Sequence, residues 1–271
     1  MAAAGFPVPP GFVVTAGTFR MFLESCDGLR VIAALTETLD VNDMAAVETA
    51  SERIRSLIVT TPLPLAIADA IRDAHNRLSQ GNLVAVRSSA VSEDGSTASF
   101  AGQQETYLNV DGADPVLQCV QECWASFFSP RALFYRAQKA VFGDTRMAVV
   151  VQVMVLADTS GVMFTVDPVR ERRDSMVIEA APGLGEAIVS GEVIPDHYVV
   201  SRADGGLVDE FIPGENGERV LRHADLNRLR ELGLRLEGFF GSPQDVEWCI
   251  RGDDLLLLQS RPITTLAGHA T

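Results

Sequence analysis

Two apolar runs separated by three turn-forming residues, close to the end of the sequence, constrain the fold more than any other feature. Residues 246–250 (VEWCI) and 255–259 (LLLLQ) flank Gly252-Asp253-Asp254, and glycine and aspartate are typical of tight β-hairpin turns. A three-residue loop would pair Arg251 with Leu255. We therefore expect an antiparallel strand pair here, with a register that can be followed along both strands.

This register predicts which side chains share a face of the hairpin. Side chains alternate between the two faces of a strand, so Glu247 lies opposite Gln259 and Asp245 lies opposite Arg261, all four on one face. On the other face, which we expect to pack on a core, are Val246, Trp248, Ile250, Leu256, Leu258 and Ser260.

The polar face of the hairpin suits a metal and phosphate site. Glu247 and Gln259 supply a carboxylate and an amide carbonyl, and Mg²⁺ is usually held by a few protein oxygens together with phosphates and water. Arg261, two residues further along the strand, can then hold a phosphate. The alternative is a solvated face with an ordinary ion pair between Asp245 and Arg261.

The rest of the sequence mixes helical and strand-like patterns, which predicts an α/β protein. Thr18 is a candidate cap for a helix over 19–25, and Pro62 and Pro64 divide a helical region over 42–80. Further expected segments are a strand that ends residues 5–15, strands at 83–86 and 105–110, helices within 115–140 with a start at Ser129-Pro130, strands within 148–155, 161–166 and 176–181, and a helix over 225–239.

A second candidate site follows the strand at 83–86. Arg87, Ser88 and Ser89 give this strand end one cation and two hydroxyls, a combination that suits a phosphate. The segment from Gly95 to Gly102 contains small residues whose N–H groups can cover an anion. The alternative is a surface loop without a function.

The charge balance limits the partners. The net charge is −14 and Lys139 is the only lysine, which argues against a nucleic-acid or anionic-membrane surface because such surfaces need clustered cations. A cationic hold on phosphate must therefore come from arginine or backbone N–H groups. No apolar run approaches the roughly 20 residues of a membrane span, and no secretory pattern opens the chain, so we expect a cytoplasmic protein.

Several common catalytic patterns are absent from the sequence. It contains no P-loop, no HExxH and no Gly-x-Ser-x-Gly. The four histidines are scattered along the sequence, and we expect each to be structural or exposed. They are His75, His197, His223 and His269. We expect buried free thiols rather than a zinc site for Cys26, Cys119, Cys123 and Cys249.

Taken in order, seven sequence blocks resemble the ATP-binding domain of the phosphoenolpyruvate synthase and pyruvate phosphate dikinase family, with rifampin phosphotransferase as a close variant. The blocks are GFPVPPGFVVT, AVRSSAVSEDGSTASFAGQQETYLNV, VVVQVMV, GVMFTVDPV, IEAAPGLGEAIVSGEVIPDHYVV, DVEW and LLLLQSRPIT. Each block alone is a weak signal. Together they are highly specific, and they cover the chain almost end to end.

The resemblance implies a fold and a set of ligands. It implies an α/β (α+β), ATP-grasp-like fold in which an N-terminal lobe, 1–150, and a C-terminal lobe, 151–271 with the closing hairpin, sandwich ATP. It further implies that Glu247 and Gln259 coordinate Mg²⁺, in agreement with the hairpin register. The implied nucleotide contacts are Arg87 and Arg261 on the phosphates, as the catalytic residues, Gly102 and Thr106 beside the nucleotide, and Gln152 near the adenine.

The activity implied by the resemblance is an ATP-dependent phosphotransferase of the dikinase type. In the family, the ATP domain phosphorylates a histidine on a swivelling domain, which this sequence lacks, so we expect a separate partner protein. The family also carries a phosphate-binding lysine ahead of the first block. Here only Arg20 or Arg30 could replace it, because Lys139 lies in an unrelated helix. A degenerate nucleotide-binding or regulatory module, or a fragment of a larger dikinase, therefore stays open.

Overall fold

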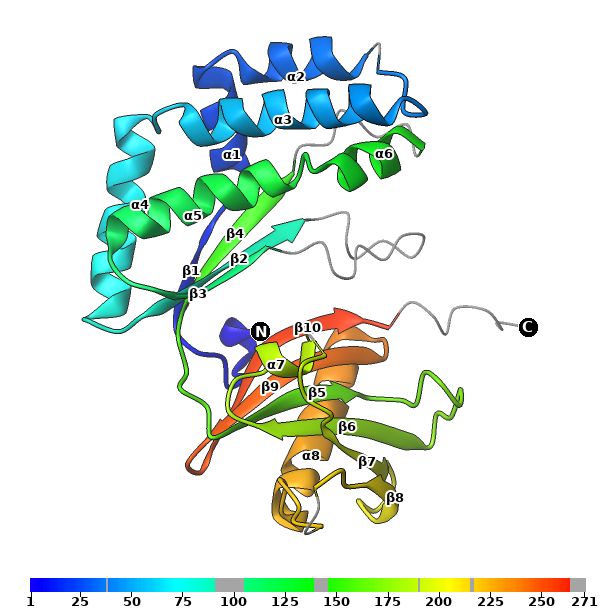
Figure 1. Cartoon of the computed structure of the whole chain (residues 1–271). Helices are drawn as coiled ribbons and strands as arrows, with labels where there is room; N and C mark the ends of the chain where they lie inside the picture. The colour runs from blue at the N-terminus through cyan, green and yellow to red at the C-terminus, as the bar shows by residue number, and fades with distance from the viewer. Residues whose placement is uncertain (38, 91–104, 139–145, 190, 215–216, 264–271) are drawn as a thin grey trace. The chain divides into compact units, whose positions relative to one another are not determined.

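The chain forms two compact units, each with its own sheet and helices. The computed structural model describes residues 1–271 apart from 38, 91–104, 139–145, 190, 215–216 and 264–271. The N-terminal unit is Pro10–Met154, and the C-terminal unit joins Met1–Pro9 to Val155–Thr271. Both sheets are antiparallel and both units carry helices (Figure 1). The expected α/β class is therefore confirmed.

The N-terminal unit contains a four-stranded sheet. Its strands are β1 (Gly11–Val14), β2 (Val84–Ala90), β3 (Thr106–Val110) and β4 (Met147–Val153). Their order in the sheet is β1-β4-β2-β3. Strand β4 thus lies between β1 and β2, although it comes last in this unit. Residues about 140 positions apart in the sequence are therefore direct neighbours in the sheet.

The helices of this unit lie on one side of that sheet (Figure 1). They are α1 (Ala16–Ser25), α2 (Gly28–Thr36), α3 (Met44–Thr60), α4 (Leu65–Ser79), α5 (Ala113–Ser126) and α6 (Pro130–Gln138). The expected cap at Thr18 is wrong, because Thr15 caps α1. Its Oγ1 accepts a hydrogen bond from the backbone N–H of Thr18 at 3.4 Å, the usual N-cap geometry, so the helix begins three residues earlier.

The expected break in the following helical region is confirmed. Pro62 and Pro64 lie between the end of α3 and the start of α4, where proline cannot continue a helix. Asp43 caps α3 by accepting backbone hydrogen bonds from Ala45 and Ala46 at 3.0 and 3.1 Å. No single described helix is long and apolar enough to cross a membrane; α3 and α4 reach that length and composition only as a pair bent by 72°.

The core of this unit lies between the helices and one face of the sheet. The fully buried Trp124 of α5 stacks on Phe19 of α1, with ring centroids 4.9 Å apart. Val84 and Val86 of β2 belong to the same buried cluster. Because strand residues alternate between faces, Arg87 lies on the face opposite the helices.

The C-terminal unit contains a six-stranded sheet in the order β10-β9-β5-β6-β7-β8. Its strands are β5 (Thr159–Phe164), β6 (Ser175–Pro182), β7 (Asp196–Ser201), β8 (Leu207–Phe211), β9 (Gln244–Arg251) and β10 (Asp254–Pro262). The long helix α8 (His223–Phe240) packs on one face (Figure 1), where Leu229 and Leu236 join the buried Trp248. The short helices are η1 (Ala2–Ala4) and α7 (Glu186–Val189).

Close strand packing in this core requires a glycine. A Cβ at Gly161 of β5 would lie 1.9 Å from the backbone oxygen of Glu179 and 2.4 Å from the ring of Trp248. A backbone oxygen cannot move away without breaking the β5–β6 pairing, so only glycine fits between the two neighbouring strands.

The closing hairpin forms with a shorter loop than expected. Asp254 pairs with Arg251, so the loop holds two residues rather than three, with Gly252 at φ +57°. A β-bulge between Leu257 and Gln259 then restores the expected pairing further along the strands.

The bulge changes which leucines face the core. Leu257 lies opposite Trp248 and is fully buried, and Leu255 packs against the same cluster. Leu256 and Leu258, expected in the core, are only half-buried. The expectation was wrong because it assumed a three-residue loop. The shorter loop shifts by one residue which side chains of β10 face the core.

Candidate functional site

The N-terminal sheet brings three predicted site residues onto the face opposite its helices. Arg87 of β2 lies directly opposite Thr106 of β3. Gln152 of β4 lies opposite Ala85, which precedes Arg87 by two residues and therefore shares its face. A guanidinium, a hydroxyl and an amide are thus collected on one surface from three strands.

The neighbouring serines have separate roles in this strand. Ser88 is buried, its Oγ accepts a hydrogen bond from the N–H of Glu105 at 3.1 Å, and its own N–H donates to the carbonyl of Glu105 at 3.0 Å. Ser88 therefore holds β2 and β3 together, whereas Ser89 is exposed. Gly102 and the segment from Gly95 lie outside the described residues.

The hairpin register places the other predicted residues as expected. Glu247 of β9 pairs with Gln259 of β10, and Asp245 pairs with Arg261. All four side chains lie on the face opposite α8, since Val246 and Trp248 between them belong to the core. The pairing predicted from the sequence is confirmed. The three-residue loop from which it was predicted is wrong, because the loop has two residues.

Arg261 forms the cross-strand ion pair that the alternative interpretation required. Its Nε donates to Oδ2 of Asp245 at 2.7 Å, and Nη2 lies 2.7 Å from the same oxygen. The Arg261 side chain is 43% exposed and that of Asp245 only 12%. A guanidinium carries five N–H donors, so this pair leaves donors of Arg261 available to a phosphate.

The charge of Glu247 acts on Asp245, the neighbouring carboxylate of β9. Burial raises the pKa of Asp245 above its usual value, the charge and hydrogen bond of Arg261 oppose this increase, and the nearby charge of Glu247 adds to it. Two carboxylates, one amide oxygen and one guanidinium therefore lie at adjacent positions of the hairpin. A divalent cation would relieve the repulsion between Asp245 and Glu247.

The oxygen donors fit Mg²⁺ better than a metal held by protein alone. Among the residues that the structure describes, no group of three or more His, Cys, Asp or Glu side chains could hold a metal ion. Mg²⁺ needs only one or two protein oxygens when phosphates and water complete its octahedron. Glu247 and Gln259 match that requirement.

A further carboxylate, which was not predicted from the sequence, lies on the same face. Glu179 of β6 lies opposite Val162, which in turn lies opposite Glu247. His197 of β7 pairs with Glu179, with Nδ1 3.5 Å from Oε1. A lone charge inside the apolar run MVIEAA was the available signal. The row of acidic and polar groups therefore continues across the sheet beyond the hairpin.

The proposed substitutes for the family lysine lie in the helices of the N-terminal unit, on the other side of its sheet from Arg87 (Figure 1). Arg20 pairs with Glu24 at 2.9 Å, and Arg30 pairs with Asp27 at 2.6 Å, both as exposed pairs in the helical layer. Lys139 lies outside the described residues. The two predicted sites therefore rely on Arg87 and Arg261 for their positive charge.

The described histidines and cysteines have no catalytic arrangement assigned to them and are placed as follows. His75 is buried in α4 and His223 begins α8, while His269 lies outside the described residues. None of the four cysteines forms a disulfide bond; the expected burial is confirmed for Cys123 and Cys249 and is wrong for Cys26 and Cys119, which are half-buried. Burial raises the pKa of the Cys119 thiol to about 11, so it is protonated at neutral pH.

Comparisons with known proteins identify relatives along the whole chain. The family model for the pyruvate phosphate dikinase AMP/ATP-binding domain matches residues 1–271. A probable phosphoenolpyruvate synthase of Archaeoglobus fulgidus is 45% identical over 288 residues, 97% of this chain and 38% of that protein. One of Methanocaldococcus jannaschii is 43% identical over 290 residues, 97% and 24%.

Another relative has a different acceptor in its name. A rifampicin phosphotransferase of Streptomyces sp is 41% identical over 282 residues, covering 97% of this chain and 33% of that protein. Among solved structures, D-alanine-D-alanine ligase from Helicobacter pylori aligns with 81% of this chain and 55% of its own at 10% identity. Its TM-score of 0.31 is too low to support an argument.

These relatives are longer than the chain, which spans between a quarter and two-fifths of the three curated proteins described above. The match to the family model nevertheless extends over every residue. The chain belongs to the family of pyruvate phosphate dikinase AMP/ATP-binding domains.

Proposed function

We propose that this chain binds Mg-ATP and transfers a phosphoryl group to a histidine of a separate swivelling-domain protein. The observation that carries the proposal is the hairpin, where Glu247 lies opposite Gln259 and Arg261 lies two positions away. The family membership supports ATP as the nucleotide. The metal, the transfer and the partner are the parts that the experiments below test.

Each unit carries a set of residues with a proposed role toward ATP. Arg87 and Thr106 bind phosphate oxygens, and Gln152 uses its amide to recognise the adenine edge. From the other unit, Glu247 and Gln259 hold Mg²⁺ while Arg261 neutralises phosphate charge. When bound, Mg²⁺ supplies positive charge to the phosphate oxygens as negative charge shifts during transfer.

The protein groups position the reactants and neutralise charge. The imidazole nitrogen of the partner attacks the β-phosphorus, a N–P bond forms, and the P–O bond to the α-phosphate breaks, so AMP leaves. The γ-phosphoryl group then departs to phosphate or water, and the β-phosphoryl group stays on the histidine. Arg87 and Arg261 stabilise the charge on the transferred group, the main protein contribution in such reactions.

Labelled ATP tests the proposal. The purified chain is mixed with a swivelling-domain protein that carries a reactive histidine, using ATP labelled with ³²P at either the β or the γ position. We expect acid-labile label on the partner from the β position, only when both proteins are present. Label on a small acceptor with the chain alone, or stable label from the γ position, would contradict the proposal.

A nucleotide-binding or regulatory module is the second candidate function. It is favoured by the shortage of cations, because the sequence contains a single lysine, and Arg20 and Arg30 are engaged in surface pairs. Calorimetry separates the two functions. Binding of Mg-ATP without transfer to any partner would support the module, whereas transfer would exclude it.

A further inference from the structure

A hollow in the C-terminal unit is lined by none of the residues assigned to ATP. It has a volume of about 610 Å³, in the range of small-molecule sites, and it lies at the end of α8 beside the loops that follow β5 and precede β9. Leu234, Val166 and Pro243 supply its apolar wall, and Arg173, Arg202, Glu237 and Ser242 its polar groups.

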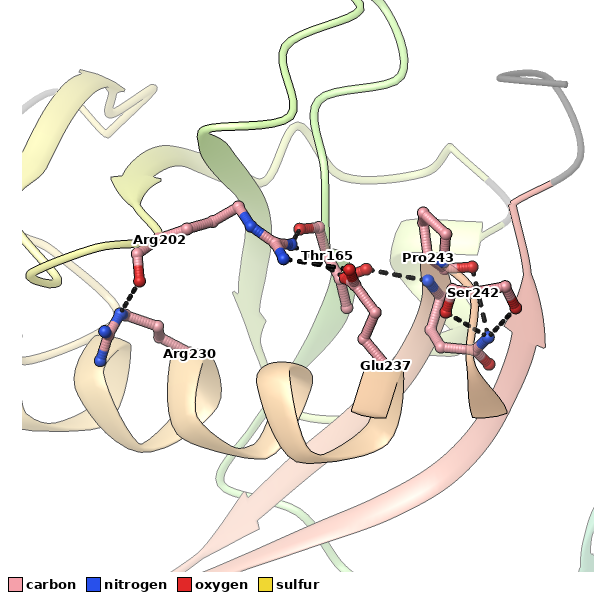
Figure 2. A network of polar contacts seen from close by, with 7 residues as sticks. Thr165, Arg202, Arg230, Glu237, Ser242 and Pro243 are labelled. Atoms are coloured by element: carbon pink, nitrogen blue, oxygen red, sulfur yellow. Dashed lines mark hydrogen bonds and ion pairs between the residues drawn. The ribbon is translucent and has the colours of Figure 1, made fainter. Parts of the chain in front are cut away.

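One pair of charges in this hollow is rigid and internally neutral. Arg202 donates to Glu237 twice, at 2.9 and 3.0 Å, and also donates to the carbonyl of Thr165 (Figure 2). Its backbone carbonyl accepts a hydrogen bond from Nε of Arg230 at 2.8 Å. Arg202 is therefore held at both ends, and its charge is compensated by Glu237.

Glu237 is the ionised acidic partner in this pair. Burial alone would raise the pKa of Glu237, but hydrogen bonds from Arg202 and Thr165 and the charge of Arg173 outweigh burial and lower it. Arg173 thus already contributes to the potential inside the hollow. The residues that line the hollow include two cations, Arg173 and Arg202, and a single carboxylate, Glu237, so one positive charge is left over.

A hydroxyl lies on the same wall. Ser242 Oγ accepts a hydrogen bond from Nε2 of Gln244 at 3.1 Å, visible in Figure 2 beside Pro243. Because a serine hydroxyl can accept and donate at once, its proton can be directed at a ligand. A cation and a donor beside an apolar wall form a binding site for an anion with an apolar body.

From this arrangement we infer a second ligand site, separate from the nucleotide site, for a small organic anion. The carboxylate or phosphoryl group of the ligand binds Arg173 and Ser242, and its apolar part lies on Leu234 and Val166. In a chain with a net charge of −14, a hollow with a surplus cation favours anions locally against the general field.

Methyl resonances of the whole chain test this site without nucleotide. Phenyl phosphate and benzoate are the anionic probes, and benzyl alcohol is the neutral probe of the same shape. We expect both anions to shift the methyl signals of Leu234 and Val166, and benzyl alcohol to bind about tenfold more weakly, the equivalent of about 1.4 kcal/mol.

Arg173→Ala tests the charge of the hollow and Gly238→Leu tests its space, and two further variants serve as controls. Arg173→Ala should weaken phenyl phosphate about tenfold, while Arg170→Ala, an exposed neighbour paired with Asp209, should not. A Cβ at Gly238 meets no atom within 4 Å, so Gly238→Leu should fill the hollow without disturbing the fold and abolish the shifts. Arg87→Ala should leave them unchanged, which separates this site from the nucleotide site.

Three results would overturn the inference. The first is equal binding of benzyl alcohol and phenyl phosphate. The second is wild-type affinity in Arg173→Ala with an unchanged melting temperature. The third is no shift of these methyl signals at probe concentrations up to about 10 mM, which would mean a binding free energy weaker than about −3 kcal/mol.

Discussion

Replacing Arg261 with alanine separates a structural role from a binding role. Arg261 pairs with Oδ2 of Asp245 through two nitrogen atoms at 2.7 Å, and the Asp245 side chain is only 12% exposed. Removing one partner of a fully buried ion pair costs about 3–5 kcal/mol. Because Arg261 is 43% exposed, we expect a smaller loss, about 1–3 kcal/mol, with a decrease in melting temperature of about 2–4 °C per kcal/mol.

A double-mutant cycle identifies the cause of that loss. In the Asp245→Asn/Arg261→Ala variant no unpaired carboxylate is left buried, so most of the stability should return. We expect an interaction energy of about 1–2 kcal/mol between the two positions. Additive losses would show that the pair contributes nothing.

The pH dependence has a definite sign. Burial, opposed by Arg261 and supported by Glu247, raises the pKa of Asp245 above 3.8, so the folded state binds this proton more strongly than the unfolded state. The contribution of Asp245 to stability is therefore greatest below pH 3.8 and falls as the pH rises through the folded-state value. Without Arg261 the opposing influence is lost, so Arg261→Ala should be more damaging at pH 7 than at pH 4.

ATP affinity gives the second readout. If Arg261 holds a phosphate, calorimetry with Mg²⁺ should show the same loss in the single and the double variant, about 1.5–3 kcal/mol or roughly 10- to 150-fold. Wild-type ATP affinity in the Asp245→Asn/Arg261→Ala variant would refute the phosphate role and leave Arg261 as a structural residue.

Four other substitutions have definite outcomes. Glu247→Gln should weaken ATP binding with Mg²⁺ present and leave the metal-free affinity unchanged; identical titrations with Mg²⁺ would exclude the metal site. Arg87→Ala should reduce ATP affinity by about 1.5–3 kcal/mol at an unchanged melting temperature, and the reverse pattern would make it structural. Gly161→Ala should cost about 3 kcal/mol in a thermal melt, because its Cβ would lie 1.9 Å from a backbone oxygen; a neutral result would refute the packing argument. His75→Leu should raise stability by about 1 kcal/mol, because neither ring nitrogen of this buried histidine has a hydrogen-bond partner among the described residues; a lower melting temperature would contradict it.

Local patterns in the sequence determined much of the fold. Pro62 and Pro64 predicted the break between α3 and α4, because proline acts on its own turn of helix. Alternation along two apolar runs predicted that Glu247 lies opposite Gln259. These inferences depend only on neighbours along the chain or across one short hairpin.

Other features depend on contacts that local rules do not encode. The bulge of β10 corrected a wrong loop length, and the shift exchanged the expected Leu256 for Leu257 in the core. Thr15 rather than Thr18 caps α1, because both hydroxyls satisfy the sequence preference and only the backbone geometry selects one.

The collection of site residues was decided by strand order. Insertion of β4 between β1 and β2 places Gln152 two positions from the row of Arg87 and Thr106, although these residues are far apart in the sequence. In the same way, Glu179 joins the row of Glu247 only through β5. The sequence alone predicted which residues suit phosphate and metal, since that prediction rests on side-chain chemistry. Only the tertiary structure decided which of them share a face, because pairing between distant strands depends on the packing of the whole core.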